Sequence, residues 1–428
     1  MGIGVVRRAA LGVEEFSDRV EVEEDMAEIA GRYVHVVLGC GGIGSAAAYW
    51  LSQRGPGPIL ALEQFALGHD KGASEDHSRI IRHAYHTTDY TSLTDAAYAA
   101  WRQIEEKTGL ALVLTTGGLD VGIGTAGEVE IASYEAALRA TGHSSEALNA
   151  RELSARYPQW RVSEDTVALY QPESGILDFH KANAAHVALA RAAGVVFAAG
   201  IPVTRITSFT DRVECTTPSG VVVAEHLTIC AGSWTAPLLA GMGVELPISL
   251  THEQVTYWST PNLLAFAPDR FPIWIYHGPT KSYYGFPVYG EAAVKAGRDF
   301  SECFVTQESR TNEPNAEQRD DLTAFMAEHL PDGLGPELYT KTCIYDLPPD
   351  RNFVLDLVPG HPRVSAFVGA GHAAKFASLI GQILSELAID GGSSYPIAPF
   401  RADRPALTDP DFPSDFRFAS AAGRAHTS

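Results

Sequence analysis

The stretch VHVVLGCGGIGSAAAYWL, residues 34–51, indicates a buried strand, a tight glycine turn and the start of a helix. The turn places Gly39, Gly41 and Gly44 at the G-x-G-x-x-G spacing of dinucleotide-binding folds. There the first glycine permits the turn, the second lets the backbone approach a pyrophosphate, and the third lets helix and strand pack closely. The helix N-terminus offers free N–H groups and a positive dipole end to the phosphates. We therefore predict that this stretch binds a dinucleotide.

The next segment, ILALEQF at residues 59–65, supports this prediction. It has the composition of a second strand and ends at Glu63, where an acid commonly holds a ribose hydroxyl. Two alternatives stay open on these residues alone. The motif does not distinguish NAD, NADP and FAD, and a strand–helix turn without a ligand can have the same spacing.

Composition excludes several classes of protein. The chain has 428 residues, enough for two or more domains, and its 45% hydrophobic and 20% charged content is ordinary for a soluble globular protein. A net charge of −20 argues against nucleic-acid and membrane partners, although a small basic pocket for an anionic substrate remains compatible with it. The five cysteines are scattered without a C-x-x-C pair, so we expect no disulfide framework, no metal site and a cytoplasmic location.

The order of patterns along the chain predicts interleaved domains. Strand–glycine–helix patterns occur near the N-terminus, at residues 227–239 and at residues 364–391, whereas the aromatic, β-rich region lies between them. We expect a mixed α/β protein with a Rossmann-like domain and a β-sheet-rich substrate domain. Helices are predicted at residues 90–108, 128–142, 180–194 and 316–329. The predicted dinucleotide domain comprises residues 32–110, 165–245 and 336–395, the substrate domain residues 111–164 and 246–335, with a poorly structured extension at 1–31 and an extended tail at 396–428.

Five further motifs identify a family. They are SRIIRHAY (78–85), YYGFP (283–287), VKAG (294–297), KTCIY (341–345) and GHAAKF (371–376). Together with the glycine turn they resemble the monomeric sarcosine oxidase and N-methyltryptophan oxidase family of FAD-dependent amine oxidases, over about residues 34–400. The resemblance implies that the dinucleotide is FAD.

The resemblance also implies roles at the flavin. Cys343 matches the cysteine that joins the flavin covalently, although a lone buried cysteine is more often an inert apolar residue. Lys295 matches the lysine that accelerates the reaction with O₂, because a fixed positive charge stabilises negative charge on oxygen; the alternative is an ordinary lysine with a solvated tip. Arg79 matches an arginine packed against the flavin ring. The residues implied to bind the cofactor are Gly39, Gly41, Gly42, Ile43, Gly44, Glu63, Gln64, Ser78, Arg79, Cys343, Gly371 and Lys375.

At the substrate end, Arg82 and Lys375 match the pair that binds the substrate carboxylate. On spacing alone, Arg79 and Arg82 fit the solvated face of a helix equally well. Tyr284, Tyr345 and His372 match residues that line the substrate and flavin face, and the family assigns catalytic roles to positions such as Tyr345 and His372.

Two departures from the family concern the substrate. The sequence has Gly297-Arg298-Asp299 where sarcosine-type members carry Gly-Tyr-His, so we include Asp299 among the substrate-binding residues. It also has Glu75 and Asp76 where a histidine and a glycine are expected. Asp299 either selects a bulkier or more basic amine or forms an ion pair with Arg298.

The sequence therefore predicts a monomeric FAD-dependent oxidase of a secondary, N-methyl or N-alkyl, amino acid that forms an imine and H₂O₂. A fructosyl-amine or cyclic imino-acid oxidase is an alternative that the Asp299 segment favours. A dehydrogenase with another electron acceptor is a second alternative, against which Lys295 argues. A flavoprotein without turnover is a third, against which the joint presence of Arg82, Lys295, Cys343 and Lys375 argues.

Overall fold

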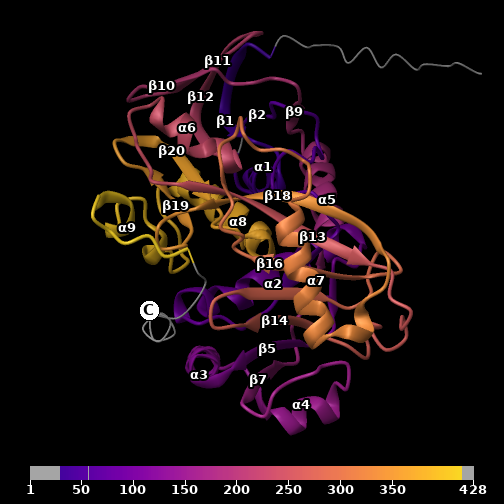
Figure 1. The fold of residues 1–428 in the computed structure, drawn as a ribbon. Helices are drawn as coiled ribbons and strands as arrows, with labels where there is room; N and C mark the ends of the chain where they lie inside the picture. Colours follow the sequence, from indigo (N-terminus) through magenta and orange to yellow (C-terminus); the bar gives the residue numbers. More distant parts are fainter. Residues whose placement is uncertain (1–28, 56, 417–428) are drawn as a thin grey trace, which may run out of the picture.

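The computed structural model describes residues 29–55 and 57–416, which form three β-sheets with helices packed against them (Figure 1). The prediction for the N-terminal extension falls on residues 1–28 and thus outside the described residues, apart from the last few before the first strand. The fold is mixed α/β, as the sequence predicts.

The glycine-turn strand lies inside an eight-stranded sheet of the described chain. The order is β10-β11-β12-β1-β2-β9, with β20 on the second half of β12 and β19 on β20. Its strands are β1 (Gly31–Leu38), β2 (Ile59–Leu62), β9 (Val196–Ala198), β10 (Arg205–Ser208), β11 (Val213–Thr217), β12 (Gly220–Ile229), β19 (Val354–Val358) and β20 (His361–Val368). Because β1 pairs in parallel with both β2 and β12, the centre of the sheet has the Rossmann-like arrangement.

Four helices share one apolar core with this sheet: α1 (Gly42–Arg54), α2 (Thr88–Thr108), α5 (Phe179–Ala192) and α8 (Ala377–Asp390). Helix α1 is rich in alanine, and a Cβ added at Gly381 of α8 would lie 2.7 Å from the Cβ of Ala46. This close contact joins the two ends of the sequence, seen as indigo and yellow elements in the same half of Figure 1. Helix α2 ends at Gly109, which has the left-handed φ of 69° of a glycine cap.

The β-rich region forms a nine-stranded sheet in the described residues, in the order β17-β13-β16-β15-β14-β5-β7-β6, with β18 on β13. Its strands are β5 (Gly118–Ile123), β6 (Glu146–Asn149), β7 (Thr166–Gln171), β13 (Ser249–Trp258), β14 (Ile273–His277), β15 (Ser282–Phe286), β16 (Val294–Asp299), β17 (Phe304–Val305) and β18 (Glu337–Leu347). Helices α3 (Gly124–Ala140), α4 (Ala150–Arg156) and α7 (Ala316–His329) pack on it. A three-stranded sheet lies beside it, with the strand order β3 (Ser78–Ile81), β8 (Gly175–Asp178) and β4 (Val113–Thr115).

The sheet pairings differ from the predicted domain segments at two strands. The sequence places β7 and β18 with the dinucleotide domain, but both pair within the nine-stranded sheet. An extended segment can pair with either sheet, and its own residues do not encode which edge it joins. The predicted tail likewise contains a short helix, α9 (Pro405–Thr408), beside its extended parts, and α6 (Thr235–Ala240) follows β12. The division into domains stays a prediction.

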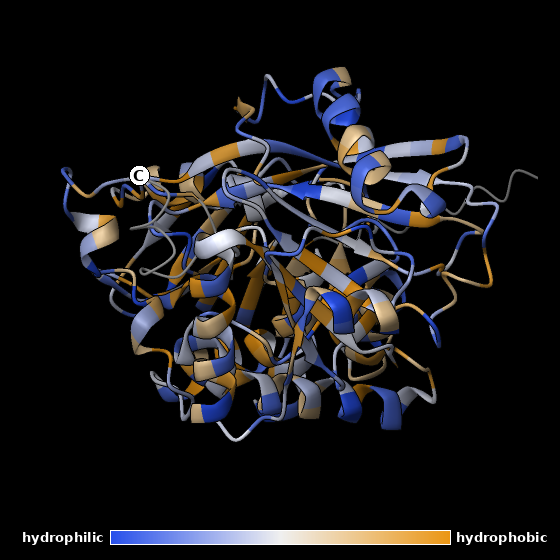
Figure 2. Ribbon diagram, turned by 60° about the horizontal axis from the view of Figure 1, so that its bottom comes forward, coloured by the Kyte–Doolittle hydropathy of each residue, from blue (hydrophilic) through white to orange (hydrophobic). Residues whose placement is uncertain are grey.

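Hydrophobic residues gather on the central strands and the inner helix faces, whereas hydrophilic residues lie on the outer helix faces (Figure 2). Among the helices of residues 29–55 and 57–416, none is both long enough and apolar enough to span a bilayer.

Candidate active site

A cavity of about 840 Å³ extends from the glycine turn after β1 to the 3-10 turn before α8. Every residue that the sequence proposes for cofactor, substrate or catalysis lines it, except Gly44. These lining residues are Gly39, Gly41, Gly42, Ile43, Glu63, Gln64, Ser78, Arg79, Arg82, Tyr284, Lys295, Asp299, Cys343, Tyr345, Gly371, His372 and Lys375. The fold thus brings together residues from three distant parts of the sequence.

Close backbone contacts require glycine at Gly39 and Gly44, whereas Gly41 packs against the side chain of Ser74. Gly39 has a left-handed φ of 91°, and a Cβ at Gly44 would lie 1.7 Å from the carbonyl oxygen of Gly39. Gly44 therefore does not contact the cavity but lets α1 start directly against the turn. A Cβ at Gly41 would lie 2.7 Å from Oγ of Ser74, so this side of the turn is open only because the residue is glycine.

Glu63 follows β2 and is buried beside the glycine turn. Its carboxylate accepts hydrogen bonds from the backbone N–H groups of Cys40, at 2.9 Å, and Phe65, at 3.0 Å. Burial raises the pKa of Glu63, but His69 and these two N–H groups outweigh burial and lower it below its ordinary value. Ser74, which the sequence does not single out, accepts a hydrogen bond of 2.9 Å from the N–H of Gly42 through Oγ. The ionised carboxylate of Glu63 therefore lies directly beside the glycine turn.

Arg79 and Arg82 do not lie on the solvated face of a helix, because their segment is strand β3 and the residue after it. Arg79 donates to the carbonyl oxygens of Ser78, at 2.9 Å, and Ala73, at 3.0 Å, which fixes its guanidinium against the cavity. Arg79 lies on β3 and Arg82 just beyond its last residue, and both side chains line the cavity.

Arg82 is buried and has a partner that sequence analysis missed. It donates to Oδ1 of Asp120 on β5 at 2.6 Å, and Nε2 of His277 lies 2.9 Å from the same oxygen. Asp120 was visible as the single acid in the apolar strand GLDVGI, but nothing in the sequence pairs it with Arg82. Arg82 is therefore a charge-balanced guanidinium at the cavity wall and not an isolated cation.

Lys375 differs from Arg82 because its positive charge is not balanced. Its Nζ donates to the carbonyl oxygen of His372 at 2.8 Å, and within residues 29–55 and 57–416 no carboxylate oxygen lies within 4.0 Å of it. The ring of Tyr85 lies 5.5 Å from Lys375 Nζ and 5.0 Å from the Arg82 guanidinium. Burial and then Arg82 lower the pKa of Lys375 well below its ordinary value. An anion in this part of the cavity would relieve both effects.

Lys295 lies at the centre of the cavity wall and is held on several sides. Its Nζ is 2.5 Å from Oδ2 of Asp76 and donates to both the carbonyl oxygen and Oγ of Ser78, each at 2.9 Å. Burial lowers the pKa of Lys295 to about 8, although Asp76 acts to raise it. Asp76, noted in the sequence only as a departure from the family, is thus the direct partner of this lysine.

Strand β18 carries Cys343 and Tyr345 on one face, two residues apart, and both line the cavity. Burial raises the pKa of Cys343 to about 12, and Arg79 acts against that rise. Gly371 has a left-handed φ of 79°, and a Cβ there would meet the ring of Tyr345 at 2.4 Å. His372 stacks on Phe353 at 4.6 Å between ring centroids, and burial, followed by Lys375 and Arg351, lowers its pKa well below its ordinary value. His372 is therefore a neutral imidazole near pH 7.

The ion pair with Arg298, one of the two alternatives that the sequence left open for Asp299, does not form. Asp299 binds the guanidinium of Arg351 through two contacts of 2.8 and 2.7 Å, whereas Arg298 binds Glu302 at 2.5 Å. Along β16, Lys295 and Asp299 line the cavity, whereas Arg298 does not, so adjacent residues of the strand are directed apart. Arg351 is a further cavity residue that the sequence did not reveal, since the contact joins two segments far apart in the chain.

Comparison with known proteins identifies the class of the molecule. A model of the family described as FAD dependent oxidoreductase matches residues 35–387, and the chain belongs to that family. The chain is therefore an FAD-dependent oxidoreductase of the kind that acts on amines.

Two curated relatives match over nearly their whole length. Monomeric sarcosine oxidase from Streptomyces avermitilis is 32% identical over 378 residues, 86% of this chain and 96% of that protein. N-methyl-L-tryptophan oxidase from Escherichia coli is 28% identical over 379 residues, 87% of this chain and 99% of that protein. Among solved structures, a variant of NikD, described as an unusual amino acid oxidase essential for nikkomycin biosynthesis, superimposes with a TM-score of 0.78 at 26% identity, covering 87% of this chain and 97% of that one. The family resemblance predicted from the sequence is confirmed.

The residues of the cavity fit FAD. The glycine turn lines the cavity with Gly39, Gly41 and Gly42, next to the N-terminus of α1. Glu63 supplies an ionised acceptor on one side, and the cavity continues from there past Arg79 to Cys343 and Lys295. The glycine turn and Glu63 would hold one end of such a dinucleotide, and residues of β3, β16 and β18 would surround the part that supplies the redox chemistry.

Proposed function

We propose that the protein is an FAD-dependent oxidase of a secondary amino acid, with an N-methyl or N-alkyl amine, that produces an imine and H₂O₂. Its substrate carboxylate binds Lys375 and Arg82. The single observation that carries this proposal is the buried amino group of Lys375, which no carboxylate of the described residues contacts, beside the balanced Arg82–Asp120 pair. Keeping a buried charge without a partner is costly, and a carboxylate ligand removes that cost.

When bound, FAD supplies the two-electron chemistry: it accepts a hydride equivalent from the substrate C–H bond, and the two electrons pass on to O₂. The protein residues position the amine for this reaction. Lys375 and Arg82 fix the carboxylate, while Tyr284, Tyr345 and the neutral His372 enclose the amine. Water then hydrolyses the released imine. Lys295 stabilises the negative charge that develops on oxygen.

Covalent attachment of FAD through Cys343 belongs to the same proposal. The thiol lines the cavity on β18, close enough to Arg79 for the guanidinium to favour its thiolate form. Burial opposes ionisation in the protein without FAD, so we expect the bond to form only after the cofactor has bound. We further propose that the enzyme acts as a monomer in the cytoplasm.

The Asp299–Arg351 pair bears on the choice of substrate. Since Arg351 balances Asp299, this part of the wall adds no net negative charge that would attract a more basic amine. The observation favours N-alkyl and cyclic imino acids of ordinary basicity over strongly cationic amines. A cyclic imino acid therefore remains the second candidate.

A panel of amines tests the proposal. Sarcosine, N-methyl-L-tryptophan, L-proline and an N-methylamine without a carboxylate are each added to the purified yellow protein. We expect anaerobic bleaching of the flavin and, in air, H₂O₂ only with substrates that carry the carboxylate. Absence of both signals with every secondary amino acid refutes the proposal. Bleaching without peroxide assigns the protein to the dehydrogenases instead.

A further inference from the structure

Asp76 occupies a position whose backbone is costly for any residue except glycine. Its φ of 91° lies in the left-handed region, and its side chain is 5% exposed. A strained backbone and a buried carboxylate each cost free energy, so a residue that combines them points to a function that the site requires.

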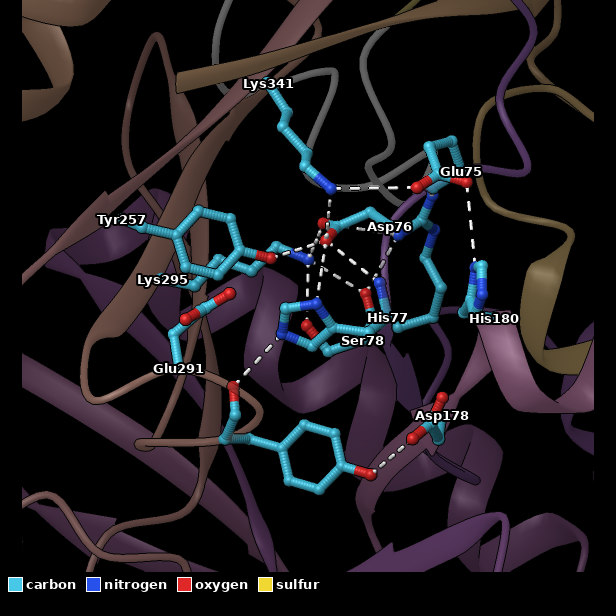
Figure 3. A network of polar contacts seen from close by, with 12 residues as sticks. Glu75, Asp76, His77, Ser78, Asp178, His180, Tyr257, Glu291, Lys295 and Lys341 are labelled. Atoms are coloured by element: carbon cyan, nitrogen blue, oxygen red, sulfur yellow. Dashed lines mark hydrogen bonds and ion pairs between the residues drawn. The ribbon is translucent and has the colours of Figure 1, made fainter. Parts of the chain in front are cut away.

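The carboxylate of Asp76 is the centre of a polar network (Figure 3). Oδ1 accepts hydrogen bonds from the hydroxyl of Tyr257, at 2.6 Å, and from the N–H of His77, at 2.9 Å. Oδ2 lies 2.5 Å from Nζ of Lys295 and 3.7 Å from the guanidinium of Arg79. Oδ1 thus holds the loop to β13 and also lies 3.9 Å from Nζ of Lys341, whereas Oδ2 faces Lys295 and Arg79.

Lys295 has no other negative charge in contact among the described residues. Its remaining neighbours are the oxygens of Ser78 and the ring of Phe286, whose centroid lies 4.6 Å from Nζ. The titratable and charged groups around it come from the loop before β3 and from β3, β13 and β18: Asp76, His77, Arg79, Tyr257, Lys341 and Cys343. Of these, Asp76 is the ionised acid, because Lys295 and Arg79 outweigh its burial and hold its pKa well below the usual range.

We propose that Asp76 is the counter-ion that keeps Lys295 protonated inside the closed site, and that it thereby sets the pH range over which the enzyme reacts with O₂. This inference rests on the proposed oxidase function. Asp76 is a positioning residue, since it acts through Lys295. Without it, two buried cations, Lys295 and Arg79, face each other, and the ammonium releases its proton more easily.

Asp76→Asn tests the charge alone. The amide oxygen still accepts from Tyr257 and from the N–H of His77, so the loop keeps its hydrogen bonds. We expect the pKa of Lys295 to fall by about one to two units from the value near 8 that burial and Asp76 produce in the native protein. The pKa is read by NMR from ¹³C-labelled lysine, which is practicable because the chain has only seven lysines and Lys295→Met assigns the signal.

The second measurement is the rate at which the reduced protein is reoxidised by O₂, recorded by stopped flow against pH. We expect the midpoint of the decline at high pH to fall with the NMR pKa, which lowers the rate at pH 7.5 by about threefold for a fall of one unit and about 25-fold for a fall of two units. The rate should recover at lower pH, because Lys295 is protonated again there. Asp76→Gly, which relieves the backbone and removes the same charge, should show the same shift if Asp76→Asn folds poorly.

Glu75→Gln is the matched control. Glu75 is the adjacent acid, but its carboxylate lies 3.7 Å from Nζ of Lys341 and 3.7 Å from the ring of His180, not against Lys295. The pKa of Lys295 should stay at its native value in this variant. An unchanged pKa of Lys295 in both Asp76 variants overturns the inference. If Lys295→Met reoxidises as fast as the native protein, the oxygen role in the proposed function fails, while the NMR comparison still decides whether Asp76 is the counter-ion.

Discussion

Asp299 and Arg351 form a two-point ion pair in the wall of the cavity, with N–O distances of 2.8 and 2.7 Å. The pair lies near Lys375, whose pKa is raised by Asp299 and lowered by Arg351. Arg351 therefore holds the carboxylate of Asp299, which could otherwise neutralise Lys375. Lys375 can bind the substrate carboxylate because Asp299 is paired with Arg351 instead.

Arg351→Met should weaken substrate binding. The freed Asp299 competes with the substrate carboxylate for Lys375, so we expect KM to rise about tenfold, equivalent to about 1.4 kcal/mol, with a smaller change in kcat. The double variant Asp299→Asn/Arg351→Met removes both charges and should recover most of the loss. Steady-state kinetics of the two variants measures this, and additive losses in the double variant would contradict the competition.

Lys375→Met should weaken substrate binding and at the same time stabilise the FAD-free protein against unfolding. We expect KM for carboxylate-bearing amines to rise about 10- to 100-fold, because a charged hydrogen bond is lost. An amine without a carboxylate should be affected little. The FAD-free protein should become more stable by about 1 kcal/mol or more, because a buried unbalanced charge disappears. Denaturant unfolding provides the second measurement, and a loss of stability together with an unchanged KM would assign Lys375 a structural role.

Cys343→Ser should leave FAD bound but release it on denaturation. After acid precipitation, the native protein should keep its yellow colour in the pellet, whereas the variant should release it to the supernatant. Cys303→Ser is the control, since Cys303 does not line the cavity. A colourless pellet from the native protein would show that the cofactor is held without a covalent bond.

Glu253 should make stability depend on pH. It is buried on β13 opposite Cys343, and burial raises its pKa to about 7 from 4.5. The folded protein binds this proton more tightly, so the contribution of Glu253 to stability is greatest below pH 4.5 and falls as pH rises to about 7, by up to about 3 kcal/mol. Glu253→Gln should reduce that slope in denaturant unfolding between these pH values. Asp346, with a pKa raised to about 6, leaves a residual slope of the same sign.

Gly44→Ala should destabilise the protein by about 3 kcal/mol or more and abolish FAD binding, since its Cβ would lie 1.7 Å from the carbonyl oxygen of Gly39. Gly392→Ala is the control, because an added Cβ there meets nothing within 4 Å and φ is not positive. Thermal unfolding and flavin content measure both variants, and a stable, yellow Gly44→Ala protein would contradict the packing argument.

Local signals predicted the parts of the fold that local physics decides. The glycine turn, helix α2 with its cap at Gly109 and helix α7 follow from spacing, capping and periodicity within one segment. The sequence did not reveal which sheet β18 joins, because an extended segment with mixed exposure can pair at either edge. The choice is made by β13, which it meets along its whole length.

The same distinction holds in the cavity. Family motifs located Arg82 and Lys295, and a departure from them located Asp299, but each charge partner lies far away in the chain and was not identified by a motif. Asp120 for Arg82, Arg351 for Asp299 and Asp76 for Lys295 all appear only when three sheets meet. Which carboxylate balances which cation is therefore a property of the assembled fold.

Strand β18 carries Cys343 in the last quarter of the chain, whereas the glycine turn lies near its start. During synthesis the glycine turn and Glu63 therefore leave the ribosome long before Cys343 does. The part of the cavity formed by the turn can thus fold before the part formed by β18. Under the proposed attachment through Cys343, we expect FAD to bind fully only after β18 has paired with β13. We therefore expect FAD to bind late in synthesis. A protein truncated before residue 343 would lack the β18 residues that line the cavity.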